Sequence, residues 1–304
     1  MNSSLLFASL LAMATPGQAP AQPAAPAACA ADAKLVERNR FTVEVAGKGP
    51  DLILIPGLST PRDVWATTCA RLAGKYRVHS VQLRGFGDAP GANANGPVLE
   101  PFVDELSAYV KQEGLKKPAI IGHSMGGLAA MMIAARRPDL PGKVMAVDAL
   151  PFIGSLFGPG TTVETVKPRA DGMRQMLLAE AAKPRSEAAG TGAGSAGNLS
   201  NTPEGRAKIA QWVSKADLRV VAQAMYDDFV TDLRPEMPKI TAPLTLLYPQ
   251  DESLLSAEQA ERTYKAGFEG AKTLNMVRIP QSYHFIMLDQ PARFEREVDA
   301  FLAP

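Results

Sequence analysis

Gly122-His123-Ser124-Met125-Gly126-Gly127 is the most informative run in this chain. It lies between a short apolar segment, residues 119–121, and an apolar segment with helical spacing, residues 125–136. A serine in the pattern G-x-S-x-G between a strand and a helix occupies a sharp turn that projects its hydroxyl above a sheet. The flanking glycines leave room for that turn to close. We therefore predict Ser124 as a nucleophile, with the Met125 amide positioned to stabilise an oxyanion.

A serine hydroxyl is a weak nucleophile until a base removes its proton. The chain has three histidines that could do so. His123 lies inside the turn, which favours a packing or scaffold role, and His79 lies in an expected strand, which favours a core or surface role. His284 follows the last expected strand on a loop before the final helix, and such loops gather the reactive groups of parallel sheets. By elimination and position we predict His284 as the base.

A carboxylate is expected to orient the base and to stabilise its protonated form. The chain order of nucleophile, acid and histidine places this carboxylate between residues 124 and 284. We predict Asp251, which follows the expected strand at 244–248. Glu252 is adjacent, and Asp148 ends an earlier strand, so both stay open as alternatives.

The second oxyanion donor is expected on the loop after an early strand, residues 51–56. Pro56 and Gly57 permit a tight turn there, and the Leu58 amide can face the same oxyanion as Met125. Another loop that follows a strand comprises residues 84–88. We expect it to shape the fold and the edge of a pocket rather than to supply a catalytic residue.

Short apolar strands alternate with helical segments from residue 40 onward, which is typical of a parallel sheet covered by helices. This α/β pattern breaks between residues 150 and 240, where amphipathic helical stretches near 164–182 and 203–229 occur without a convincing buried strand. We therefore expect a core made of residues 32–149 and 241–304, with residues 150–240 inserted as a helical cap.

Composition narrows the function classes. The 304 residues are 46% hydrophobic with a formal net charge of +1, and acids balance lysines and arginines along the chain. No nucleic-acid partner is expected. Two cysteines and three histidines exclude the common Cys/His zinc sites. Cys29 and Cys69 can form one disulfide in an oxidising compartment, or can be two unrelated thiols.

The N-terminus favours export. An apolar run of about ten residues, 5–14, is too short for a membrane span of about twenty. It is followed by an Ala/Pro-rich stretch, so residues 1–31 are expected to be a signal peptide and spacer, although no basic residue precedes the run. The mature protein is then periplasmic or secreted, without an integral membrane segment; a disordered tail is the alternative.

Over residues 40–303 the chain resembles the α/β-hydrolase superfamily, in its cap-bearing serine esterase-like branch. The matching pieces are Pro56-Gly57-Leu58, Arg84-Gly85-Phe86-Gly87, Gly122-His123-Ser124-Met125-Gly126-Gly127, Asp251, Tyr283-His284-Phe285 and Asp289-Gln290-Pro291. Members of this branch often have His where this chain has Pro56. Many also have Gly at Pro249 and one more residue before the acid, which by ungapped counting favours Glu252.

The resemblance implies an eight-stranded, mostly parallel sheet with helices on both faces and a cap over its catalytic end. It also implies a catalytic triad that hydrolyses small-molecule esters, of small to medium size, through an acyl-enzyme intermediate, with neither metal nor organic cofactor. Related dehalogenases and epoxide hydrolases have Asp at the nucleophile position, and Ser124 argues against both of these activities. The alternatives are an acyltransferase or carbon–carbon hydrolase with the same triad, and a non-catalytic hydrolase-like binding protein.

Overall fold

A computed structural model describes residue 29 and residues 33–158, 160–183 and 199–304. The expected signal peptide therefore lies outside the described residues. The single sheet consists of β1 (Lys34–Glu37), β2 (Phe41–Ala46), β3 (Asp51–Ile55), β4 (Arg77–Leu83), β5 (Ala119–His123), β6 (Lys143–Val147), β7 (Leu244–Gln250) and β8 (Leu274–Pro280). Within the described ranges, no helix is both long enough and apolar enough to cross a bilayer.

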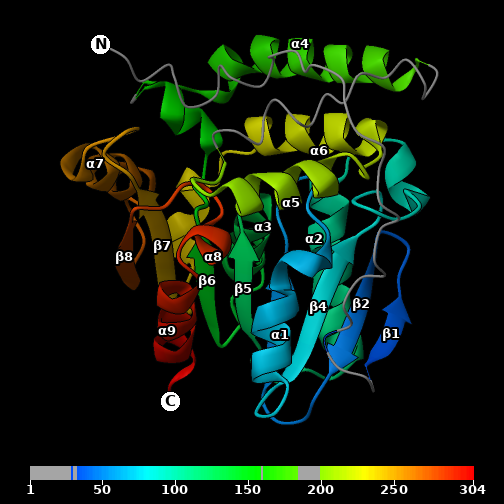
Figure 1. Cartoon of the computed structure of the whole chain (residues 1–304), viewed down its shortest axis with the longest axis vertical. Coiled ribbons are helices and arrows are strands. Elements are labelled where there is room, and N and C mark those ends of the chain that lie inside the picture. Colours follow the sequence, from blue (N-terminus) through cyan, green and yellow to red (C-terminus); the bar gives the residue numbers. More distant parts are fainter. Residues whose placement is uncertain (1–28, 30–32, 159, 184–198) are drawn as a thin grey trace.

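The strand order is β1-β2-β4-β3-β5-β6-β7-β8 (Figure 1). Strand β2 is antiparallel to both of its neighbours, and every pairing from β4 to β8 is parallel. Parallel strands need crossover helices, which cover both faces of the sheet and make the central strands apolar throughout. β3 and β5 are accordingly almost wholly buried. The expected eight-stranded, mostly parallel sheet is confirmed.

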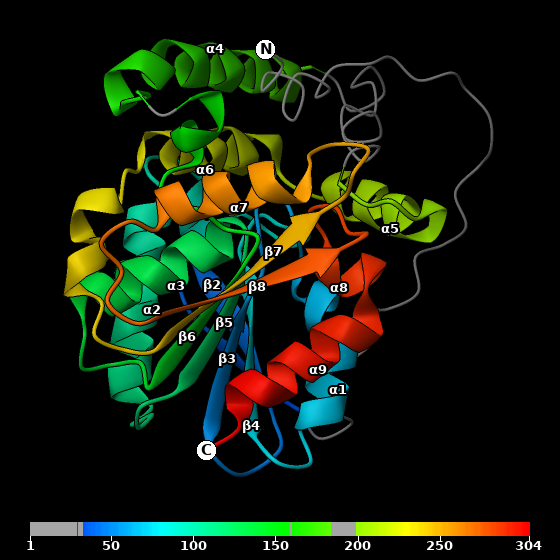
Figure 2. The ribbon, with the colours of Figure 1, turned by 90° about the vertical axis from the view of Figure 1, so that its left-hand side faces the viewer.

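Helices lie on both faces of the sheet (Figure 2). One hydrophobic core joins the sheet to α2 (Leu99–Gln112), α3 (Met125–Arg136) and α7 (Ala257–Gly267). The other joins it to α1 (Ala66–Leu72), α8 (Ile286–Asp289) and α9 (Pro291–Leu302). α3 is buried along nearly its whole length, which the small residues of its sequence permit because the helix can approach the strands closely.

A disulfide links Cys29 to Cys69 of α1, with the two Cα atoms 5.3 Å apart. Both cysteines are buried against the core formed by α1, α8 and α9. The pairing that the sequence left open is therefore made. Because the bond closes a loop between positions 40 residues apart, it limits the conformational freedom of the unfolded chain.

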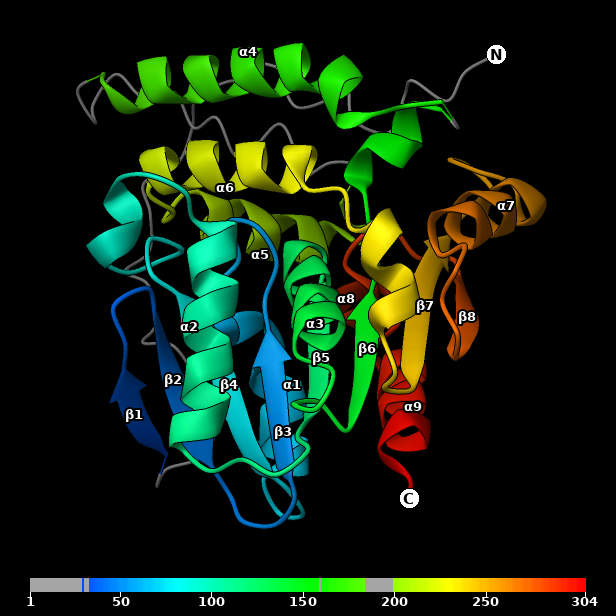
Figure 3. The same cartoon turned by 180° about the vertical axis from the view of Figure 1, so that it is seen from behind.

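Between β6 and β7, the described residues form the α-helices α4 (Val163–Ala181), α5 (Pro203–Val213) and α6 (Leu218–Val230). The described residues also form short helical turns: η1 (Arg62–Trp65) before α1, η2 (Gly91–Ala94) before α2, η3 (Ile153–Phe157) before α4 and η5 (Arg234–Lys239) before β7. We refer to the helices between β6 and β7 as the cap. α6 lies over the carboxyl ends of the strands, and α4 lies over α6 (Figures 1 and 3).

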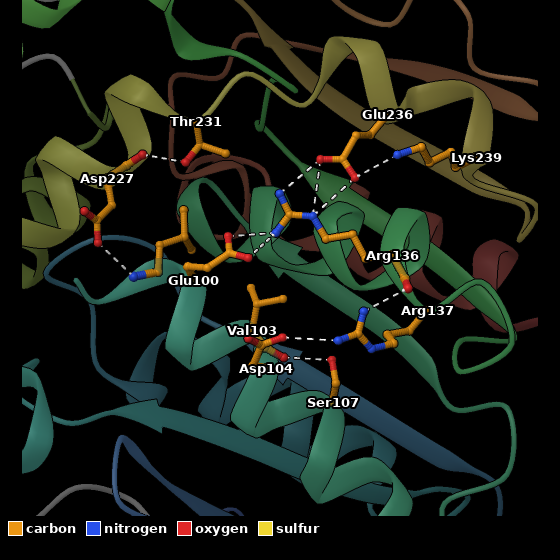
Figure 4. Close-up of polar contacts among 11 residues, drawn as sticks. Glu100, Val103, Asp104, Ser107, Arg136, Arg137, Asp227, Thr231, Glu236 and Lys239 are labelled. Atoms are coloured by element: carbon orange, nitrogen blue, oxygen red, sulfur yellow. Dashed lines mark hydrogen bonds and ion pairs between the residues drawn. The ribbon is translucent and has the colours of Figure 1, made fainter.

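Polar contacts attach the cap to the sheet domain (Figure 4). Asp227 of α6 accepts hydrogen bonds from the backbone amides of Val98 and Leu99 at the start of α2, at 2.6 and 3.0 Å. Such amides have no partner within their own helix, so the carboxylate both caps α2 and fixes α6. At the end of α3, Arg136 forms ion pairs with Glu100 of α2 and Glu236 of η5.

The fold differs from expectation in two details. Strand β1 was not predicted from the sequence, because it is a short and mostly exposed edge strand. The helical stretch expected at 203–229 is divided into α5 and α6, because the chain turns at residues 214–217 and Asp217 caps the second helix by accepting from the amide of Arg219. The amide of Asp217 also donates to the carbonyl of Gly85 at 2.7 Å. The loop at residues 84–88 thus supports the cap.

Candidate active site

Ser124 occupies the turn between β5 and α3, as expected, with φ 53° and ψ −125°. A positive φ is costly for a residue with a side chain, and such strain persists only where the surroundings enforce it. The Ser124 amide is fixed by a 2.9 Å hydrogen bond to the carbonyl of Val147 on β6. A Cβ atom at Gly122 would collide with the carbonyl of Gly126. The glycines are therefore required for the turn to close, and the Ser124 side chain stays partly exposed.

The loop after β3 lies directly against this turn. A Cβ atom at Gly57 would lie 3.0 Å from Cβ of Ser124, and one at Gly126 would collide with the carbonyl of Pro56. Within the described part of the chain, neither the Leu58 amide nor the Met125 amide donates to a protein acceptor. The Met125 amide is in the first turn of α3, where amides lack partners and the helix dipole is positive. Both predicted oxyanion donors are therefore available to a ligand.

His284 lies on the loop between β8 and α8, and its imidazole packs against the turn that bears Ser124. The rings of His284 and His123 have centroids 4.5 Å apart. His123 Nε2 donates to the backbone carbonyl of His284 at 3.1 Å. Burial, and then the nearby charge of His284, hold the pKa of His123 well below its usual range. His123 is therefore a neutral scaffold residue, as expected, that fixes the position of the base.

His284 pairs with Asp148 rather than with Asp251. Its Nδ1 lies 2.5 Å from Oδ2 of Asp148, and both side chains are only partly exposed. Asp148 follows β6, and its backbone has φ 43°. The other carboxylate oxygen, Oδ1, accepts a short hydrogen bond from the Tyr264 hydroxyl of α7. Burial, followed by the charge of Asp148, raises the pKa of Tyr264 well above its usual value, so Tyr264 remains a donor.

The structure thus corrects the expected position of Asp251, which does not reach His284. The Asp251 carboxylate accepts from the amide and the hydroxyl of Ser253, at 3.0 and 2.5 Å, in a local turn after β7. Short acidic side chains commonly bond the backbone two residues onward in this way. Glu252 is exposed and accepts instead from Gln250 at 2.8 Å. Of the three carboxylates considered, Asp148 alone contacts the base.

Asp289 is a further residue of the site, for which the sequence motifs predict no role. Its carboxylate accepts from the amide of Tyr283, beside His284, at 2.8 Å. The same carboxylate accepts from the Ser200 hydroxyl and the Asn201 amide, which lie just before α5. Asp289 therefore joins the loop that carries the base to the cap. In the sequence, Asp289 belongs to the run Asp289-Gln290-Pro291 that contributes to the family resemblance, but the run does not indicate this contact.

The remaining histidine lies elsewhere. His79 of β4 is buried and bonds the Tyr109 hydroxyl at 2.7 Å and the Asp51 carboxylate at 3.2 Å. Burial lowers the pKa of His79, and the carboxylate of Asp51 partly offsets this effect. It is a core residue, as expected. No three His, Cys, Asp or Glu side chains in the described ranges are grouped so that they could bind a metal ion.

Backbone strain gathers around the site. Five non-glycine residues among those described have a positive φ, and four of them follow strands at the same end of the sheet: Ser59, Ser124, Asp148 and Gln281. Strained backbone of this kind is found at sites where side chains must be directed at one point.

The chain is similar to known proteins in both sequence and structure. A family model described as "Alpha/beta hydrolase family" matches residues 52–297. A pimeloyl-[acyl-carrier protein] methyl ester esterase of Aeromonas hydrophila is 31% identical over 140 residues, covering 46% of this chain and 52% of that protein. The match thus spans only about half the length of that relative. The enzyme of the same name from Vibrio atlanticus is 26% identical over 261 residues, covering 84% of this chain and 93% of that protein.

Among solved structures, a hydrolase from Pseudomonas aeruginosa superposes with a TM-score of 0.71 at 20% identity. The superposition covers 90% of this chain and all of that one. At this level of identity the likeness shows the shared fold.

Proposed function

The chain belongs to the alpha/beta hydrolase family, and we propose that within this family it is a serine-dependent carboxylic ester hydrolase. The observation that carries the proposal is the hydrogen bond from His284 to Asp148 beside the strained turn of Ser124. A histidine oriented by a carboxylate next to a partly exposed serine is the arrangement that activates a hydroxyl for attack on a carbonyl. The names of the relatives, which are methyl ester esterases, agree with a small-molecule ester as substrate.

The proposed reaction has two steps. In the first, His284 takes the proton of Ser124 Oγ while this oxygen attacks the carbonyl carbon of the ester. Asp148 stabilises the imidazolium that forms, and the Leu58 and Met125 amides donate to the oxyanion. The imidazolium then gives its proton to the departing alcohol, which leaves an acyl group on Ser124.

In the second step, His284 takes a proton from water, and the resulting hydroxide attacks the acyl-enzyme. Collapse of this intermediate releases the carboxylic acid and returns the proton to Ser124. Three apolar residues of the cap, Ala170, Met225 and Phe229, form a cluster, and Leu58 packs against it. This supports acyl or alcohol groups of small to medium size.

The decisive test is hydrolysis of a chain-length series of p-nitrophenyl esters by the full chain. We expect turnover of short to medium esters, and a loss of roughly 10³-fold or more in kcat for Ser124→Ala. A fluorophosphonate should label the unmodified protein once and the variant not at all, as measured by intact mass. Turnover that persists in Ser124→Ala would overturn the proposal.

We also propose that the protein is exported. The Cys29–Cys69 disulfide supports this, because such bonds persist in oxidising compartments. The apolar run at residues 5–14 agrees with a secretory signal. Expression of the full chain in a Gram-negative host, followed by fractionation and mass measurement, tests the idea. A shortened protein in the periplasm or medium is expected, and full-length protein confined to the cytoplasm contradicts it.

A further inference from the structure

Helix α6 lies over the carboxyl ends of the strands (Figures 1 and 3). On one of its faces, Val221 and Ala224 are part of the core shared with the sheet. Met225 and Phe229, together with Ala170 of α4, form a cluster against which Leu58 packs. This part of α6 therefore lies beside the loop that supplies one proposed oxyanion donor.

Asp228 lies on this part of α6 and has no assigned role. It follows Val221 by seven residues, so it shares the face of the helix that Val221 turns to the core. Its side chain is only 7% exposed. Across the described ranges no hydrogen bond or ion pair engages its carboxylate. The adjacent Asp227 differs, since it binds the amides of Val98 and Leu99 and the side chain of Gln223.

The charges near Asp228 come from the active site and from its neighbour. The charge of His284 acts on Asp228 and favours its ionised form, whereas that of Asp227 opposes it. Burial is the larger effect and raises the pKa of Asp228 to about 7. A buried carboxyl without a partner is costly, and such a group is usually paired with a cation or a set of donors. None of the described residues pairs with the Asp228 carboxylate.

We propose that Asp228 is a substrate-binding residue that pairs with a cationic group, such as a substituted ammonium, on the ester. A cation balances the buried charge and the adjacent charge of Asp227, which a neutral hydroxyl would leave unbalanced. The inference deepens the proposed function, because it assigns a substrate class to the same site. It places the cation beside α6, near the charge of His284.

Binding in the Ser124→Ala background tests this without any need for turnover. Two pairs of esters serve as probes. The first pair is butyrylcholine and the ester in which carbon replaces its quaternary nitrogen. The second pair consists of two ethyl esters. One has a quaternary nitrogen at the far end of its acyl chain, and the other has carbon in place of that nitrogen. Titration calorimetry at neutral to slightly alkaline pH gives Kd for each member of both pairs.

In at least one pair the cationic ester should bind about tenfold or more tightly than its neutral counterpart. Adding Asp228→Asn, which keeps the shape of the side chain, should reduce that ratio to within about twofold. Adding Glu164→Gln, which removes an exposed carboxylate of α4, is the matched control and should leave the ratio unchanged.

Two results would overturn the inference: no preference for the cation in either pair with Asp228 intact, or a preference that survives Asp228→Asn. The first result is measured with Asp228 intact, so it tests the inference even if the Asp228→Asn variant does not fold. Failure of the proposed function is separate, since it would appear as absent turnover of p-nitrophenyl esters by the unmodified protein.

Discussion

Nδ1 of His284 lies 2.5 Å from Oδ2 of Asp148, a residue at the end of β6 and 136 positions earlier in the chain. The same carboxylate binds the Tyr264 hydroxyl through its other oxygen. Both oxygens are therefore engaged, and the carboxylate cannot rotate without losing a bond. A carboxylate held in this way fixes the tautomer of the imidazole, with the proton on Nδ1 and the lone pair of Nε2 available to act as base.

The first prediction concerns this carboxylate. Asp148→Asn should lower kcat on p-nitrophenyl esters by on the order of 10³- to 10⁴-fold, because the amide can donate to Nδ1 and favours the wrong tautomer. Asp251→Asn and Glu252→Gln are matched controls and should retain activity within about threefold, since both side chains bond only to their own loop. A larger loss in Asp251→Asn than in Asp148→Asn would contradict the geometry.

The sequence does not distinguish Asp148 from Asp251 as the carboxylate that binds the base. Both residues end parallel strands on the same edge of the sheet, so the rule that reactive groups gather there does not separate them. The paths of the two loops make the difference. Asp251 turns into a local bond with Ser253, while Asp148 leaves β6 with a positive φ. Neither feature can be read from single residues.

Other features followed directly from the sequence. Short apolar runs predicted the buried strands, and the glycines around Ser124 predicted its turn. Both features depend only on residues that are close together in the chain. Contacts between distant segments could not be predicted in this way. Tyr264 and Asp289 reach the site from α7 and from the end of α8, and their residue types carry no signal until the helices are packed.

The second prediction concerns Tyr264 as a positioning residue. Tyr264→Phe should lower kcat about tenfold, because the Asp148 carboxylate loses the hydrogen bond that holds it in the orientation in which it meets Nδ1 of His284. It should also move the acid limb of the kcat/KM profile to higher pH, since Asp148 with one donor fewer interacts more strongly with the imidazolium. A purely structural role would not move this limb.

Tyr248→Phe is the matched control for Tyr264. Its ring packs on that of Tyr264 with centroids 4.9 Å apart, and its hydroxyl makes no hydrogen bond to any described residue. The control should therefore keep both kcat and the pH profile. If the two variants behave alike, the hydroxyl of Tyr264 has no specific role.

The third prediction concerns the disulfide. A loop of 40 residues corresponds to a stabilisation of about 4 kcal/mol in the chain-entropy model. Reduction with dithiothreitol should lower the free energy of unfolding in urea by about 2 to 4 kcal/mol. The Cys29→Ala/Cys69→Ala variant should begin at the lower value and show no response to the reductant. An equal response in both proteins would mean that the reductant acts elsewhere.

The fourth prediction concerns the pH dependence of stability without a bound ligand. Folding raises the pKa of Asp228 from its ordinary value near 3.8 to about 7, so the folded protein binds this proton more tightly than the unfolded chain. The resulting stability is present below about pH 4 and is lost as the pH rises through about 7. The charged groups that set this behaviour are His284 and Asp227.

Asp228→Asn cannot lose that proton, so its stability should not fall over the same range. Relative to the variant, the unmodified protein should lose roughly 2 to 4 kcal/mol between about pH 4 and pH 8, as measured by urea unfolding at each pH. Glu164→Gln should follow the unmodified protein, because its carboxylate is exposed. Parallel curves for the unmodified protein and Asp228→Asn would show that Asp228 is ionised throughout and already has a partner. In the Ser124→Ala background, where the ester is not hydrolysed, an added cationic ester should reduce the loss above pH 7, because a ligand that pairs with the ionised carboxylate stabilises the folded protein in that form.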